Sequence, residues 1–135
     1  MVDKQLHQLN QKLSELPGIS YPYTRPEAKR VYWASNLIFI DEKKAGCPKG
    51  AILKALRAEG VQVSDGSYDV QHRYKLYSEA KWWHHPVVIP QDLDGTAQVN
   101  MRAVRLPIFH DEASALITDY IKAFEKVWAN RSQLR

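Results

Sequence analysis

The stretch VYWASNLIFI, residues 31–40, decides the fold that we expect for this chain. Most of its residues are aromatic, β-branched or otherwise apolar, which is typical of a β-strand. Apolar side chains occupy both alternating sets of positions, so neither face of such a strand suits water. We therefore expect a long buried strand over residues 31–40 and not an exposed edge strand.

A helix is predicted on the N-terminal side of this strand. Its apolar stripe repeats every three or four residues over residues 3–16 and consists of Leu6, Leu9, Leu13 and Leu16. Pro17 and Gly18 should end the helix. Residues 19–29 hold further prolines and predict an extended connector that leads into the strand.

On the C-terminal side, residues 41–46 predict a polar turn. Pro48 suits the first turn of a helix that should reach about Glu59, because its missing N–H is not needed there. Gly60 is expected to cap this helix in the left-handed conformation. A short strand should follow over residues 61–63.

The segment from residue 65 to residue 100 has no clear periodicity, and it is too long for an ordinary loop inside a compact domain. Loops of this length usually carry function or cover a partner. Residues 101–109 then predict a strand, and Asp111 could cap the final helix. That helix has a broad apolar stripe: Ala113, Leu116, Ile117, Tyr120, Ile121, Phe124, Val127 and Trp128.

This order of elements predicts a single α+β domain over residues 1–135, with a small, mostly antiparallel three-stranded sheet and helices packed on one face. The single cysteine, Cys47, excludes an internal disulfide. No apolar run approaches the ~18 residues of a membrane span, and we expect a cytoplasmic protein. The formal net charge of +4 is spread among acidic residues, so charge alone does not indicate nucleic-acid binding.

Catalytic and metal-binding patterns are not found. The adjacent histidines His84 and His85 would point to opposite sides of an extended chain, and no Cys, Asp or Glu lies at a familiar ligand spacing. Cys47 precedes a predicted helix, where a thiol pKa can be lowered, but no histidine is placed to act with it. We therefore predict no catalytic residue and no metal site.

An aromatic and basic segment, QHRYKLYSEAKWWHHP, covers residues 71–86. Its rings could stack on sugars or bases while its cations meet phosphates, which would suit a free-standing carbohydrate- or nucleic-acid-binding module. Alternatively, Tyr77, Trp82 and Trp83 fill core or interface space, as aromatic side chains often do. No recognisable nucleic-acid-binding motif accompanies the segment.

Two stretches together resemble a known family. Residues 50–77, GAILKALRAEGVQVSDGSYDVQHRYKLY, resemble the small-domain signature of the DegT/DnrJ/StrS sugar aminotransferases, in which a helix ending LRAEG leads into a strand, a tyrosine-containing loop and HRxxLY. Residues 101–128 are similar to the closing segment of that family, where a strand ending in LP precedes a helix ending AxxKV. The resemblance is nearest to the glutamine:scyllo-inositol aminotransferase branch.

The resemblance implies the C-terminal small domain of a fold-type-I enzyme that depends on pyridoxal 5′-phosphate (PLP). In that family a large domain holds PLP through a Schiff-base lysine and precedes the small domain. We expect that large domain to be absent from residues 1–135, so the chain by itself should bind no cofactor and should not transaminate. Its partner would be a large PLP-binding domain, a split partner chain or a second copy.

The resemblance also implies which residues of the central loop face a substrate, namely Tyr68, His72, Arg73 and Tyr77. The substrate would be a keto sugar or cyclitol that receives an amino group from glutamate or glutamine. Family members often have a proline shortly before the loop histidine, and residues 68–72 of this chain contain none. The missing proline counts against a substrate contact by His72.

Overall fold

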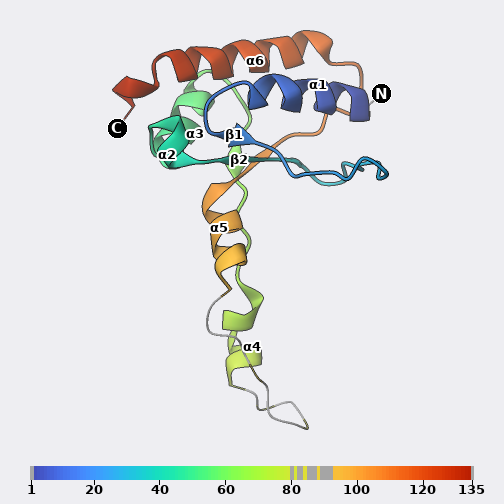
Figure 1. The fold of residues 1–135 in the computed structure, drawn as a ribbon, viewed down its shortest axis with the longest axis vertical. Coiled ribbons are helices and arrows are strands. Elements are labelled where there is room, and N and C mark those ends of the chain that lie inside the picture. Colours follow the sequence, from blue (N-terminus) through green and yellow to red (C-terminus); the bar gives the residue numbers. More distant parts are fainter. Residues whose placement is uncertain (1, 80, 82–83, 85–87, 89–92, 135) are drawn as a thin grey trace.

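The computed structural model describes residues 2–79, 81, 84, 88 and 93–134. Figure 1 shows two regions, which we call the body (residues 2–65 and 103–134) and the arm (the described residues 66–79, 81, 84, 88 and 93–102). The body packs helices onto a small sheet. The arm projects from it along the longest axis of the molecule.

The body contains an antiparallel sheet of four strands in the order β1-β2-β4-β3. The strands are β1 (Ile19–Ser20), β2 (Asn36–Ile40), β3 (Ser64–Asp65) and β4 (Ala103–Leu106). The predicted α+β class with an antiparallel sheet is confirmed, but the sheet has one strand more than predicted. The additional strand, β1, lies in the predicted connector and pairs Ile19 with Ile40.

The prediction of a strand over residues 31–40 is wrong for its first half. Strand β2 begins at Asn36, whose pairing partner in β4 is Leu106. The next position along β4 is Pro107, which has no N–H for a ladder hydrogen bond, so the pairing stops there. Residues 31–35 therefore leave the sheet, and Val31 and Trp33 are 79% and 88% exposed.

Three helices cover one face of the sheet: α1 (Val2–Ser14), α3 (Lys49–Ala58) and α6 (Ser114–Ala129). Their apolar stripes pack against Ile38 and Ile40 of β2 and Val104 and Leu106 of β4 to form one buried core. The predicted helices over residues 3–16 and 48–59 agree with α1 and α3 to within two residues. The apolar stripes that can be recognised in the sequence therefore explain why these helices lie on one face of the sheet.

Helix ends follow the predictions in part. Gly60 has a φ of 85°, as expected for a left-handed cap. The predicted turn at residues 41–46 contains the short helix α2 (Glu42–Ala45), which Asp41 caps by accepting hydrogen bonds from the backbone N–H groups of Lys43 and Lys44. The predicted Asp111 cap of the last helix is wrong, because the Ala113 N–H donates instead to Gln5 Oε1 on α1 at 2.7 Å.

The remaining differences from the predictions lie in the arm and in the two strands next to it. The pairing expected at residues 61–63 occurs at β3, and the strand expected over residues 101–109 is shortened to β4. The residues just before β4 belong to helix α5 (Asp94–Arg102), which was not predicted. Short helices η1 (Gln71–Arg73) and α4 (Lys75–Ser78) lie further out, and η2 (Arg131–Gln133) ends the body. Among the described helices, none is long and apolar enough to cross a membrane.

Candidate functional site

The arm holds a groove of about 630 Å³, which we call the arm groove. It is lined by Tyr68, Asp69, Val70, Gln71, His72, Tyr77, Val88, Leu93, Thr96 and Asn100. Three of the four residues predicted to face a substrate, Tyr68, His72 and Tyr77, therefore line one hollow. The fourth, Arg73, is exposed and is not among the lining residues.

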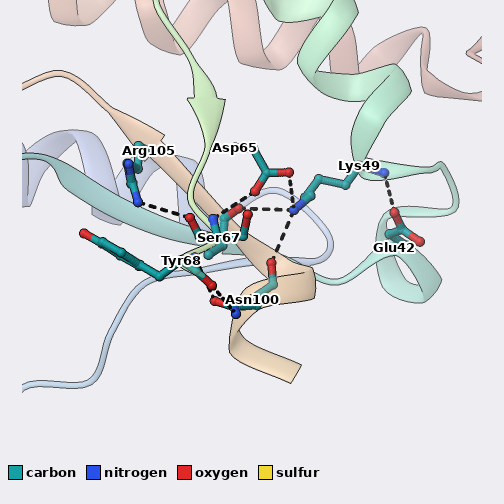
Figure 2. A network of polar contacts seen from close by, with 8 residues as sticks. Glu42, Lys49, Asp65, Ser67, Tyr68, Asn100 and Arg105 are labelled. Carbon is teal, nitrogen blue, oxygen red and sulfur yellow. Dashed lines mark hydrogen bonds and ion pairs between the residues drawn. The ribbon is translucent and has the colours of Figure 1, made fainter. Parts of the chain in front are cut away.

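Asn100, at the end of α5, fixes the backbone of Tyr68 from both sides. The Tyr68 N–H donates to Asn100 Oδ1 at 3.1 Å, and Asn100 Nδ2 donates to the Tyr68 carbonyl at 2.8 Å. One side-chain amide thus imitates the paired hydrogen bonds of a β-ladder. This pairing joins the two chain segments of the arm where they leave the body (Figure 2).

Arg105, on β4, supports the aromatic ring of Tyr68. Its guanidinium carbon lies 4.2 Å from the ring centroid, a cation–π contact, and one of its terminal nitrogens donates to the Ser67 carbonyl at 3.2 Å. The Nε of Arg105 is buried and has no partner among the described residues. The Tyr68 side chain is still 66% exposed, so one ring face is held while the ring stays accessible.

Lys49, at the start of α3, ties the base of the arm to the body. Its side chain is only 11% exposed, and its ammonium lies 3.2 Å from Asp65 Oδ2. The same ammonium donates to the carbonyls of Ala103 at 3.3 Å and Asn100 at 3.5 Å. Figure 2 shows this side chain reaching from α3 to the base of the arm, beside β3 and β4.

A glycine allows β3 and β4 to approach each other closely at the base of the arm. A Cβ on Gly66 would lie 2.7 Å from the backbone nitrogen of Val104 and 2.9 Å from the Cβ of Ala103. The Gly66 N–H donates to the Ala103 carbonyl at 3.0 Å. Any side chain here would push β3 away from β4 and shift the direction of the arm.

Two ionisable groups near the groove have shifted pKa values. The pKa of Asp65 is lowered from 3.8, chiefly because its carboxylate accepts the Ser67 N–H, with a further contribution from Lys49. The pKa of Tyr74 is raised because its hydroxyl donates to Asp69 Oδ2 at 2.9 Å. Asp69 is therefore held as an acceptor at the rim of the groove.

Other candidate groups of the sequence do not form a reactive site. Cys47 is buried, and burial raises the pKa of its thiol, which is opposite to the lowering considered from the sequence. In the described part of the chain, no group of three or more His, Cys, Asp or Glu side chains could hold a metal ion. Of the aromatic and basic segment, Ala80, Trp82, Trp83, His85 and Pro86 lie outside the described residues.

The arm groove offers aromatic rings, an imidazole, an amide, a carboxylate and a threonine hydroxyl. Such a mixture suits a ligand with apolar ring faces and several hydroxyl groups. It does not suit PLP, which needs a free lysine amine for the Schiff base and donors for its phosphate. Among the described residues no Lys or Arg lines the groove, and the buried Lys49 amine is already engaged.

The residues that organise the groove were not found from the sequence. Asn100, Arg105 and Lys49 carry no motif, and each lies far along the chain from its partner, as with Arg105, which comes 38 positions after Ser67. Only Lys49 had a recognisable place in the sequence, because it is the first helical residue after Pro48. The tyrosine-containing loop was singled out from the sequence as facing a substrate, and three of its four named residues line the arm groove.

Comparisons with known proteins agree with the family resemblance. The sequence profile of the DegT/DnrJ/EryC1/StrS aminotransferase family matches residues 3–125. A search of curated protein sequences finds no match.

Several solved structures are similar to this chain in fold, among them one that is an aminotransferase by name. The aminotransferase TlmJ from Streptoalloteichus hindustanus is similar over 96% of this chain and 31% of its own, with a TM-score of 0.68 and 17% identity. DesI, solved in the presence of its TDP-sugar product, gives a TM-score of 0.70 and 18% identity over the same shares of the two chains. S. venezuelae DesV, in complex with a ketimine intermediate, gives 0.64 and 20% identity over 93% of this chain and 30% of its own. The present chain therefore spans less than a third of each of these proteins.

Proposed function

Because this chain belongs to the DegT/DnrJ/EryC1/StrS aminotransferase family, we propose that it forms the C-terminal small domain of a sugar or cyclitol aminotransferase. The arm groove would face the substrate. PLP would be held by a large domain, on the same polypeptide or on a partner chain, with assembly from two copies as the alternative. The chain by itself would not transaminate.

The observation that carries this proposal is the convergence of Tyr68, His72 and Tyr77 on one groove. The sequence resemblance singled out these residues without knowledge of their positions in space. Tyr68 is held by two residues: Asn100 hydrogen-bonds to its backbone, and Arg105 lies against its ring. A ring fixed in this way loses little freedom when a ligand packs against it.

The similar structures support a sugar as the substrate class. DesI was solved with a TDP-sugar product, and the Helicobacter pylori protein PseC is an aminotransferase involved in the biosynthesis of pseudoaminic acid. The hydroxyl groups of a sugar would meet Asp69, Gln71 and Asn100, while its apolar ring face would meet a tyrosine. We assign these residues to binding and orientation of the substrate and not to proton transfer.

When bound by the large domain, PLP supplies the electron sink that amino-group transfer requires. The residues of this chain would contribute three things: contacts to the sugar, its orientation and exclusion of water from one side of the substrate. Substitutions in the arm groove should accordingly change kcat/KM without removing the cofactor.

The test is a reconstitution. The purified chain is titrated with PLP and should show no aldimine absorbance band. The chain is then combined with a lysine-bearing large domain of the family and assayed for amino transfer from glutamate or glutamine to a TDP-linked keto sugar and to a keto cyclitol. We expect activity only in the combined sample.

Within the active assembly, Tyr68→Ala should lower kcat/KM by about tenfold or more, because it removes the held ring from the groove. Leu76→Ala is the matched control, since Leu76 lies on the arm, is 53% exposed and is not among the lining residues. The proposal is wrong if the isolated chain forms an aldimine, or if Tyr68→Ala and Leu76→Ala have equal effects.

A further inference from the structure

A second groove lies on the body, between α1 and residues 21–32, and has a volume of about 690 Å³. We propose that it binds a phosphate ester carried on a sugar or nucleoside ring. We call it the cationic groove. It shares no lining residue with the arm groove, so the proposal does not depend on the proposed function.

The first argument is charge. Four of the lining residues are basic, namely Lys4, Arg25, Lys29 and Arg30, whereas Asp3 is the single acidic one. By contrast, no Lys or Arg among the described residues lines the arm groove. An anion in the cationic groove would accept charge-assisted hydrogen bonds from several of these Lys and Arg side chains.

The second argument is that much of this donor capacity is unused. The side chains of Lys4 and Arg25 have no hydrogen-bond or ion-pair partner among the described residues. Lys29 pairs with Asp3 at 3.3 Å, but its side chain is 82% exposed, so this pair stabilises the fold little. These cations are therefore not explained by the stability of the body.

The third argument is that one wall is rigid. Arg30 donates to the Pro22 carbonyl at 3.3 Å, and its guanidinium lies 4.7 Å from the centroid of the Tyr32 ring. The Tyr32 hydroxyl accepts a hydrogen bond from Asn10 at 3.2 Å, and Asn10 is itself buried and paired with Asn36. Arg30 keeps further N–H donors in a fixed direction, since a guanidinium has five.

The fourth argument concerns the tyrosines, which point to a ring on the ligand. Tyr21 and Tyr32 are half-buried and pack against the core, whereas Tyr23 is 82% exposed. An exposed aromatic face beside several cations can stack on a base or a sugar while the cations meet a phosphate. The volume of the groove lies within the range of about 300–1,000 Å³ that is typical of small-molecule sites, which favours a small ligand over a polymer.

The test is an NMR titration of the 135-residue chain at low salt with four probes. Thymidine 5′-monophosphate and glucose 1-phosphate each carry a ring and a phosphate, inorganic phosphate lacks the ring, and thymidine lacks the phosphate. We expect both esters to shift the backbone amide signals of Lys4, Arg25 and Arg30, inorganic phosphate to bind more weakly, and thymidine to bind least. The ester that binds more tightly identifies the source, and added salt should weaken both.

Variants then test the contacts. Arg25→Ala should weaken binding of the tighter ester by about tenfold, the cost of one hydrogen bond to a charged group. Tyr23→Ala should weaken it by about fivefold or more through loss of stacking. Both residues are exposed, so both variants should fold. Lys122→Ala is the matched control, because Lys122 lies on α6, is not among the residues that line the groove, and has its only ion pair in the described part of the chain with Asp119.

Three outcomes would overturn the proposal. The first is the absence of shifts at the cationic groove with either ester. The second is equal weakening by Arg25→Ala and Lys122→Ala, which would indicate nonspecific attraction to basic surface. The third is binding of inorganic phosphate as tightly as either ester, which would show that the ring makes no contact.

Discussion

The body and the arm are held together by different interactions. All the buried hydrophobic side chains in the described part of the chain belong to the body, and none of the described residues between 67 and 102 is buried. The arm is ordered instead by individual polar contacts from Asn100, Arg105 and Lys49. The difference shows that the arm groove rests on a few polar contacts, whereas the body rests on a buried apolar core.

The largest expected effect is in the body. Phe124 on α6 is fully buried and stacks on Trp128 with ring centroids 6.0 Å apart. Phe124→Ala should lower the free energy of unfolding by about 3–5 kcal/mol, because it leaves a cavity in the core. Urea unfolding measures the loss. Leu116→Ala on the same helix, where the side chain is 46% exposed, should change it by less than about 1 kcal/mol.

A smaller effect is expected where the two regions meet. Lys49→Met keeps the apolar stem but removes the ammonium that Asp65 and two carbonyls surround. We expect a loss of about 1–2 kcal/mol in the free energy of unfolding, because polar groups lose a buried partner. Lys126→Met, which breaks the exposed pair with Glu59, should cost only about 0–1 kcal/mol. Equal losses would mean that Lys49 does not connect the arm to the body.

In the arm the expected effect is local. Asn100→Ala removes both hydrogen bonds to the Tyr68 backbone, so the Tyr68 amide should exchange with solvent about tenfold faster. The free energy of unfolding of the body should hardly change. Hydrogen exchange followed by NMR measures the first quantity and urea unfolding the second. The exposed Gln98, also on α5, provides the control Gln98→Ala, which should leave exchange at Tyr68 unaltered.

The smallest effect concerns pH. The pKa of Asp65 is lowered from 3.8, mainly by the Ser67 N–H, so its ionised form stabilises the folded chain. This stabilisation is present above the ordinary pKa and is lost as pH falls through the lowered one. The stability difference between the native chain and Asp65→Asn should therefore be largest near neutral pH and shrink below about pH 4. The free energy of unfolding of both proteins is measured in urea at several pH values. Parallel curves of this free energy against pH would contradict the prediction.

Much of the fold was predictable, and less of the candidate site was. The leucine stripe of α1 and the Pro48 and Gly60 signals of α3 are local, and the structure confirms both helices. Helix α5 was missed because its apolar residues form no stripe that faces a core, and none of its residues is buried. Tyr68, His72 and Tyr77 could be proposed from a motif, but their common groove needed the fold of the arm.

The sequence by itself determined the elements whose hydrogen bonds close within about four residues, together with the apolar faces of those helices. Tertiary structure alone decided where β2 begins, because that depends on Pro107 in a strand distant along the chain. It also decided the setting of Tyr68, whose partner Asn100 lies 32 residues away. Strand pairing and side-chain clamps join distant segments, and no local pattern encodes which segments will meet.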